Sequence, residues 1–129
     1  MLMIGSDAYN YINVLGKAAN ASQVRNEVLS NNLANVDTPN YKRQDVSFEN
    51  YLQTAIAGNS SLDRAINNVR LDSLNTSIYT DTAALSYRLD GNNVDVDTEN
   101  AYLAQNQIRY YTLVDSISQE FSRIKSVLK

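Results

Sequence analysis

Two long stretches, one at each end of the chain, carry apolar residues at alternating steps of three and four. From about Ser6 to Asn35 this spacing predicts one helix, and Ser6 or Asp7 is expected to cap its start. The main stripe comprises Ala8, Ile12, Leu15, Ala19, Ser22, Leu29, Leu33 and Val36. A second, narrower stripe comprises Val14, Ala18, Ala21 and Val28. The helix is therefore predicted to be packed from two directions.

The clearest period lies at the C-terminal end. The stripe comprises Leu103, Gln107, Tyr110, Val114, Ile117, Phe121, Ile124 and Leu128, of which Gln107 alone is polar. Asp97 is the expected N-cap, and Glu99 lies in the first turn, where the helix dipole favours a negative charge. The period is typical both of a buried helix in a small bundle and of one strand of a coiled coil.

The residues between these helices show weaker patterns. Val46, Phe48, Tyr51, Leu52, Ala55 and Ile56 recur at mixed helical spacings, which predicts a short amphipathic helix that ends at Gly58. Residues 85–89 alternate between apolar and polar, which predicts an extended strand with Ile78–Thr80 as a candidate hairpin partner. Apolar residues are sparse in 59–84, so we expect this segment to be the most mobile part of the free chain.

These patterns together predict a mainly α fold. The long N- and C-terminal helices form an antiparallel, coiled-coil-like hairpin, joined by a short helix and a partly extended, flexible middle segment. We expect one domain over residues 1–129, with the first helix in 1–37, the middle segment in 38–96 and the last helix in 97–129. The predicted helix seam comprises Ile12, Leu15, Leu29, Leu33, Val114, Ile117, Phe121, Ile124 and Leu128.

Composition removes several classes of function. The 129 residues include no cysteine and no histidine, so disulfides, thiolate chemistry and histidine-based catalysis or metal binding are excluded. A net charge of −3 argues against a nucleic-acid binder with a basic patch. We expect no cofactor, metal or small-molecule substrate. Apolar runs are too short for a membrane span, and residues 1–16 lack the basic and apolar regions of a cleaved signal peptide.

Residues 31–41, Asn-Asn-Leu-Ala-Asn-Val-Asp-Thr-Pro-Asn-Tyr, contain the first motif. Pro39 must end the helix, and Asn40 is expected to adopt a positive φ angle. The motif resembles the signature of axial proteins of the bacterial flagellum, with Asn40 in place of the usual glycine. The matching residues are Asn32, Leu33, Ala34, Asn35, Thr38, Pro39 and Tyr41.

A second motif precedes and enters the last helix. It resembles the C-terminal signature of the FlgB-type flagellar basal-body rod proteins, and Asp45-Val46-Ser47-Phe48 is also similar to that subfamily. The residues that carry this second match are Gly91, Asn92, Asn93, Val94, Asp95, Asp97, Glu99, Asn106 and Tyr110. The short chain fits the same subfamily, whereas residues 59–84 contribute nothing to the resemblance.

The resemblance implies a structural subunit of the proximal rod of the flagellar basal body. Such a subunit assembles through its terminal helices into a helical tube that transmits torque. The implied partners are further copies of the chain, other rod subunits, basal-body ring or adaptor proteins and the flagellar export apparatus. Export across the inner membrane is implied to proceed without a cleaved signal peptide.

Other functions have weaker support from the sequence. The spacing of Asp95, Asp97 and Glu99 is compatible with a calcium site. The glycine and the distant glutamate of an EF-hand loop are missing, so capping of the last helix is the better interpretation. No nucleophile motif, basic partner or glycine-rich loop accompanies the acidic residues, so we expect no enzyme and no catalytic residue. A soluble helical adaptor or chaperone-like protein is the alternative, and the two motifs argue against it.

Overall fold

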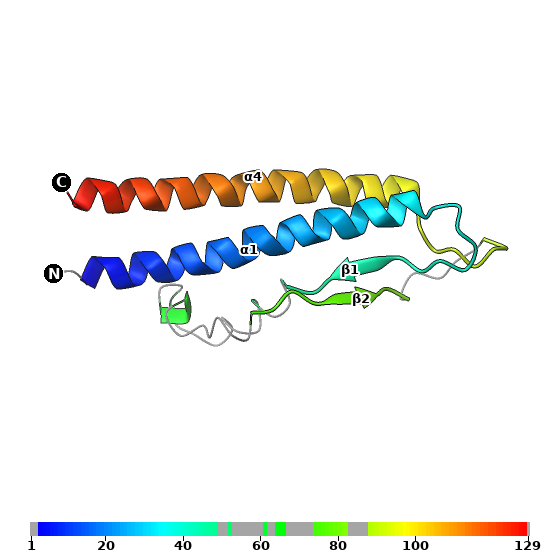
Figure 1. Ribbon diagram of the computed structural model, residues 1–129, viewed down its shortest axis with the longest axis horizontal. Helices are drawn as coiled ribbons and strands as arrows, with labels where there is room; N and C mark the ends of the chain where they lie inside the picture. The colour runs from blue at the N-terminus through cyan, green and yellow to red at the C-terminus, as the bar shows by residue number, and fades with distance from the viewer. Residues whose placement is uncertain are drawn as a thin grey trace.

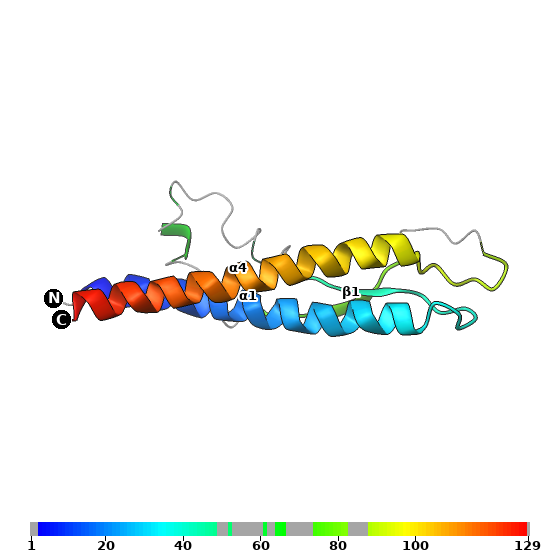
Figure 2. The same cartoon turned by 90° about the horizontal axis from the view of Figure 1, so that it is seen from above.

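The computed structural model describes residues 3–48, 52, 61, 64–66, 74–82 and 88–128, with side chains in the first helix from Tyr9 onward. Its elements are helix α1 (Met3–Ala34), strand β1 (Gln44–Val46), strand β2 (Ile78–Thr80) and helix α4 (Val96–Val127). Leu52 and residues 64–66 are also helical. The two long helices run side by side, and both chain termini lie at the same end of the molecule (Figures 1 and 2). The predicted mainly α fold with an antiparallel pair of terminal helices is confirmed.

Helix α1 is the middle layer of the molecule, with α4 on one side and the sheet on the other (Figure 1). Its narrower stripe faces the middle segment. The buried cluster comprises Val14, Ala21, Phe48, Ile66 and Leu74, and Tyr11, Ala18, Val46 and Leu52 pack against it. Small residues on α1 leave room for Phe48 and Leu74 to approach the helix closely. The two-directional packing predicted for this helix is present.

The predicted helix seam is unevenly covered within one chain. Leu29 is fully buried, and Ile12, Leu15, Leu33, Ile117 and Ile124 are half-buried. Val114, Phe121 and Leu128 are 40%, 53% and 78% exposed, so these three seam residues are not buried within the single chain.

The sheet differs from the sequence prediction at Val46. Strand β2 pairs antiparallel with β1, with Asp45 opposite Tyr79. The predicted partner strand at residues 85–89 lies mostly outside the described residues. Val46 therefore lies in a strand and not in the predicted amphipathic helix, which in the described residues is represented by Leu52, whose N–H donates to the Phe48 carbonyl. Strands of three residues are too short to show a period, so a helical spacing was the stronger local signal. Residues 83–87 and most of 49–60 lie outside the described residues.

The two long helices end or begin close to the predicted positions. Helix α1 begins at Met3, so Ser6 and Asp7 lie inside it and do not cap its start, which corrects that prediction. It ends at Ala34, and Asn40 has the expected positive φ angle, 61°. The N-cap of α4 is Asp95 and not the predicted Asp97, because the helix begins at Val96. The Asp95 carboxylate accepts hydrogen bonds from the Asp97 N–H at 3.1 Å and from the Thr98 hydroxyl at 3.0 Å. Asp97 and Glu99 therefore lie in the first turn.

The segment 59–84 contributes to the core where it is described. Ala65, Ile66 and Leu74 are 3%, 7% and 1% exposed, although the sequence shows no continuous stripe linking them to the helices. The prediction of few buried contacts is wrong at these three residues, because apolar side chains separated by polar ones can still meet one helix face. The mobility expected of segment 59–84 in the free chain stays a prediction.

We expect Leu29→Ala to lower the free energy of unfolding by about 2–5 kcal/mol, because the fully buried side chain leaves a cavity between packed elements. Urea unfolding followed by circular dichroism measures this loss. Leu128→Ala is the matched control: Leu128 is 78% exposed, so its change should stay within about 0.5 kcal/mol. Equal effects of the two substitutions would contradict the burial assigned to Leu29.

Candidate functional site

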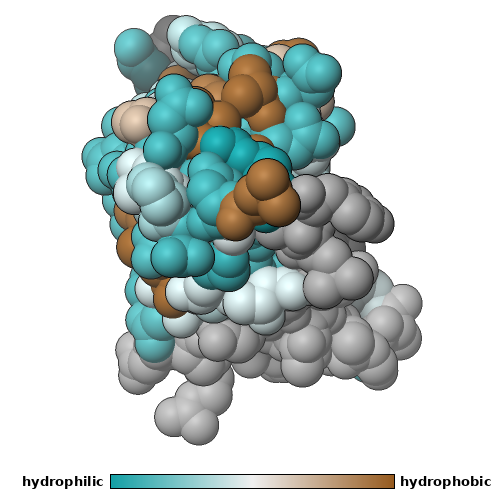
Figure 3. Space-filling model, turned by 90° about the vertical axis from the view of Figure 1, so that its right-hand side faces the viewer, coloured by the Kyte–Doolittle hydropathy of each residue, from teal (hydrophilic) through white to brown (hydrophobic). Residues whose placement is uncertain are grey.

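Most residues of both motifs meet at the end of the molecule where α1 stops and α4 begins (Figure 1). Two turns lie against each other there: the Asn40 N–H donates to the Asp90 carbonyl at 2.7 Å, and the Asn93 N–H donates to the Tyr41 carbonyl at 3.3 Å. Viewed from this end, the surface of the described residues is mostly hydrophilic with some apolar side chains (Figure 3). The sequence motifs, which are far apart along the chain, thus form one site in the fold.

Asn92 fixes the turn that follows α1. Its side-chain amide is fully buried and donates to the carbonyls of Asn35 at 2.8 Å and Thr38 at 2.9 Å. Its Oδ1 accepts from the Val94 N–H at 2.8 Å. A single side chain therefore satisfies three backbone groups that no helix or sheet pairs.

Asn32 joins α1 to both other layers. Its Nδ2 donates to the Gln44 carbonyl at 2.8 Å and to the Glu99 carboxylate at 3.1 Å. Its Oδ1 accepts from the Gln44 N–H at 2.9 Å and from the Tyr41 hydroxyl at 3.0 Å. All four hydrogen-bonding positions of this buried amide are filled. The N–H and carbonyl of Gln44 in β1 both bond to Asn32, as they would bond to a residue on a neighbouring strand.

Arg43 lies at the centre of a buried ion-pair network. Its Nε donates to the Glu99 carboxylate, its Nη1 to Asp81 Oδ2 at 2.5 Å and its Nη2 to Asp45 Oδ2 at 3.1 Å. Arg43 and Glu99 are 5% and 0% exposed. We call Arg43, Asp45, Asp81 and Glu99 the Arg43 network. It links the start of α4 to the strand layer.

A second arginine and an aromatic ring extend the Arg43 network to α1. Arg25 Nε donates to Asp45 Oδ1 at 2.8 Å and its Nη2 to Oδ2 at 3.3 Å. The guanidinium carbons of Arg25 and Arg43 each lie 5.3 Å from the centre of the Tyr102 ring. The negative face of an aromatic ring attracts such cations. Tyr102 thus adds a contact from α4 to both arginines.

The ion pairs outweigh burial in setting the charges of this network. Burial lowers the pKa of the Arg43 guanidinium, but the hydrogen bond and charge of Glu99, then Asp45 and Asp81, raise that pKa above its ordinary value. Burial raises the pKa of the Asp45 carboxyl, but hydrogen bonds from Arg25 and the Val46 N–H, with the arginine charges, hold that pKa below its ordinary value. Both groups are therefore ionised at neutral pH.

At Gly91 of the second motif, the backbone passes close to Asn40 of the first motif. Gly91 has a φ angle of +77°, and a Cβ there would lie 2.6 Å from Asn40 Oδ1. Lys42 Nζ donates to the Gly91 carbonyl. Asn93 Oδ1 accepts from the Arg43 N–H at 2.7 Å, while its Nδ2 donates to the Asp81 carbonyl at 2.8 Å. Gly91 and Asn93 thus position the backbone on either side of the Arg43 network.

The remaining motif residues lie at the edges of this site or outside it. Asn35 Oδ1 accepts from the Thr38 hydroxyl at 3.0 Å, and Val94 is buried. Ala34, Thr38, Pro39, Asp95 and Asp97 are exposed, whereas Leu33 is half-buried. Asn106 and Tyr110 lie farther along α4: Asn106 donates to the Ser22 carbonyl at 2.7 Å, and the Tyr110 ring meets Tyr111 edge-on at 6.1 Å.

Sequence reasoning missed the central residue of the site. Arg43, Arg25, Asp81 and Tyr102 carry no period or motif, and isolated charged residues are normally solvated. The available signal was position: Arg43 lies two residues after the first motif and two before Asp45, which belongs to the subfamily resemblance.

The geometry of the site is that of a structural junction. Its acids are engaged with arginine, and no group of three or more acidic side chains among the described residues is arranged to hold a metal ion. In the part of the chain that the structure describes, no helix combines the length and apolar character needed to span a membrane. The Arg43–Glu99, Arg43–Asp81 and Arg25–Asp45 ion pairs each join parts of the chain that are far apart in the sequence.

Comparison with known proteins points to one family. The family described as "Flagella basal body rod protein" matches residues 12–42, which include most of α1 and the first motif. The chain is 38% identical to the flagellar basal body rod protein FlgB of Bacillus subtilis, over 88% of this chain and 89% of the relative. It is 37% identical to FlgB of Borrelia hermsii (95% and 93%) and 31% identical to FlgB of Escherichia coli (88% of both).

We expect Arg43→Met to lower the free energy of unfolding by about 3–5 kcal/mol, because the substitution leaves Glu99 as a buried charge without its cation. Chemical unfolding of the purified chain measures the loss. Arg123→Met is the matched control, since Arg123 pairs with Glu120 at the surface, with 72% of its side chain exposed, and should cost about 0–1 kcal/mol. A loss below 1 kcal/mol for Arg43→Met would contradict the burial of the network.

The depressed pKa of Asp45 predicts a loss of stability in acid. The unfolded chain binds a proton at Asp45 near the ordinary value of 3.8, whereas the folded chain binds it at lower pH, so stability falls as the pH drops through this window. In Asp45→Asn, stability at neutral pH should be lower and its decline between about pH 4 and 2 shallower than in the unsubstituted chain. Asp115→Asn, on an exposed helix face, should leave the slope unchanged; thermal melts across this pH range provide the comparison.

Proposed function

The chain belongs to the family of flagellar basal body rod proteins, and we propose that it is a structural subunit of the proximal rod of the bacterial flagellar basal body. We propose further that residues 1–129 act as one rod-type domain. In this proposal, further copies and other rod subunits pack against its terminal helices to form a helical tube that transmits torque.

The exposed apolar face of α4 carries this proposal. Ile108, Tyr111, Val114 and Phe121 are 68%, 63%, 40% and 53% exposed. At about 100° per residue they fall within about 140° of the helix circumference, and the buried Glu99 lies outside this arc, about 40° from Phe121. Large apolar side chains gathered on one exposed face mark an interaction surface. A neighbouring helix is the simplest element to cover such a stripe.

The Arg43 network gives the proposed subunit a fixed end. Its buried ion pairs and amide hydrogen bonds hold the start of α4, the end of α1 and the sheet in one arrangement. A subunit that transmits torque needs this kind of rigid junction, so that load on one helix reaches the other without rearrangement.

The proposed partners follow from the family. We propose contacts with other rod subunits, with basal-body ring or adaptor proteins and, before assembly, with the flagellar export apparatus, which would carry the chain across the inner membrane without cleavage. The proposal includes no catalytic role. A soluble adaptor or chaperone-like role is the alternative that the experiment below separates from it.

The direct test is the composition of purified basal bodies. In a motile strain whose own gene carries a small tag, this chain should remain with the basal body after detergent extraction, and deletion of the gene should leave the cells without rods. An adaptor or chaperone would instead stay in the soluble fraction, and deletion would leave completed rods detectable by electron microscopy.

We expect Phe121→Asp to prevent rod assembly while leaving the free chain folded. Phe121 is 53% exposed, so the new charge stays in water in the free chain, whereas an assembled interface would bury it without a partner. Motility, basal-body recovery and the melting temperature of the purified chain are the readouts. Ser122→Asp adds the same charge at the adjacent exposed position and should assemble; normal motility of Phe121→Asp would contradict the interface.

A further inference from the structure

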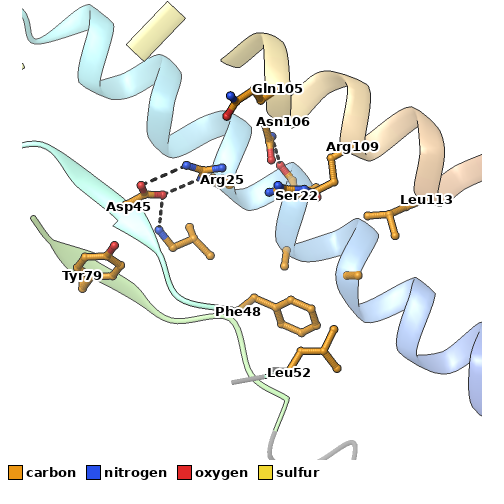
Figure 4. A pocket seen from close by; sticks show the side chains of 13 residues that line it. Ser22, Arg25, Asp45, Phe48, Leu52, Tyr79, Gln105, Asn106, Arg109 and Leu113 are labelled. Carbon is orange, nitrogen blue, oxygen red and sulfur yellow. Dashed lines mark hydrogen bonds and ion pairs between the residues drawn. The ribbon is translucent and has the colours of Figure 1, made fainter. Parts of the chain in front are cut away.

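Strand β2 has one edge that pairs with no other strand in the part of the chain that the structure describes. The sheet has two strands, and β1 lies between α1 and β2 (Figure 1). Figure 4 shows β2 beside β1, with Tyr79 next to Asp45, its partner in the ladder. All three residues of β2 are exposed. We call the side of β2 that faces away from β1 the open edge.

The ladder between the strands fixes which backbone groups point to the open edge. The Asp81 N–H donates to the Arg43 carbonyl at 2.8 Å, so these two residues form a hydrogen-bonded pair at the end of the ladder. In an antiparallel sheet, such pairs alternate with pairs whose N–H and C=O groups turn outward. Thr80 comes next to Asp81, and Ile78 lies two residues farther on. The N–H and C=O groups of Ile78 and Thr80 therefore point away from β1.

The other edge of the sheet is already occupied by α1. Gln44 lies opposite Thr80, and its N–H and carbonyl bond to the Asn32 side chain at 2.9 Å and 2.8 Å. Asn32 thus takes the place of a third strand beside β1. Since no described residue does the same for β2, the sheet can be extended only at the open edge.

The sequence of β2 lacks the features with which proteins usually protect such an edge. These features are a charged side chain, a proline or a bulge. Ile78, Tyr79 and Thr80 supply none of them, their register with β1 is continuous, and all three residue types favour strands. Ile78 and Tyr79 are 52% and 43% exposed. Asp81 follows directly and is bonded to Arg43, so the Arg43 network holds the edge in place.

We propose that the open edge of β2 binds an extended segment of a neighbouring rod subunit, which becomes the third strand of the sheet. The backbone groups of Ile78 and Thr80 identify the occupant, because donors and acceptors at strand spacing are matched by another extended polypeptide. Apolar side chains of that segment pack beside Ile78 and Tyr79. The inference rests on the proposed function, because it takes the neighbour to be a subunit of the same assembly.

The incoming strand is neither of the two described strands of a second copy. Because β2 has one open edge, pairing of β2 with β2 would join the same surface twice and close into a dimer, whereas a growing tube requires contacts between different surfaces. Strand β1 of a second copy is excluded because β2 and Asn32 occupy both of its edges. The occupant is therefore a different segment, which becomes extended when it docks.

Thr80→Pro tests the outward hydrogen bond. Edge strands accept proline where the lost N–H faces solvent, so the melting temperature of the free chain should stay within about 5 °C of the unsubstituted value. Recovery of the variant in basal bodies should fall at least tenfold, because proline removes a ladder donor and places its ring where the incoming strand lies. Thr80→Val keeps the N–H and should assemble normally. Equal recovery of the two variants would overturn the proposal.

A photo-crosslinking amino acid in place of Ile78, whose side chain is 52% exposed, identifies the occupant. Irradiated basal bodies should give a product that joins this chain to a segment of another rod-type subunit outside that subunit's β2. The same probe at Ser118, on the exposed side of α4, reports assembly independently of the sheet. If Thr80→Pro does not fold, this experiment decides the question alone.

The two probes separate failure of this inference from failure of the proposed function. A product at Ser118 without one at Ile78 overturns docking at the open edge and leaves the rod subunit in place. An Ile78 product that contains lipid, cell-wall material or β2 of a second copy also overturns it. Absence of the chain from basal bodies removes both the inference and the proposed function.

Discussion

The buried ion pair between Arg43 and Glu99 is the interaction on which the rest of the structure depends. Neither charge is tolerated in the interior without the other, because desolvation of an unpaired ion costs several kcal/mol. Glu99 lies in the first turn of α4, and Arg43 precedes β1. The strand layer and the last helix must therefore come together for either to be stable. This mutual need selects one arrangement of the junction from the many that apolar contacts alone allow.

Asparagine side chains complete the junction where regular structure is missing. The chain between the end of α1 and β1 has backbone groups that neither a helix nor a sheet pairs. Asn92 and Asn93 supply donors and acceptors to that backbone, and Asn32 does the same for β1. An amide group suits this role because it both donates and accepts within one plane. The asparagine-rich motifs thus fix an irregular segment without additional secondary structure.

The remainder of the molecule is less complete than its junction. Apolar side chains on α4 face solvent, and the buried amide of Asn106 has one unfilled acceptor. In a chain that folds alone, polar residues on the exposed face of α4 and an apolar residue at position 106 would be more stable. In the proposed assembly, neighbouring subunits would cover the apolar side chains of α4. The Arg43 network is fully paired within the chain, whereas the apolar face of α4 is exposed. This difference is consistent with a subunit of a larger assembly.

The sequence by itself determined the two long helices and the end of α1 shortly before Pro39, because these depend on local spacing and backbone geometry. It also indicated their antiparallel pairing, because the chain between them turns back. It also determined the family, because two motifs match it. The pairing of β1 with β2 and the burial of Arg43 were decided by the tertiary structure. Three-residue strands have no period to detect, and a charged side chain is buried only when partners from distant segments converge on it. Local pattern carries no information about that convergence, which is why the junction became visible only in the fold.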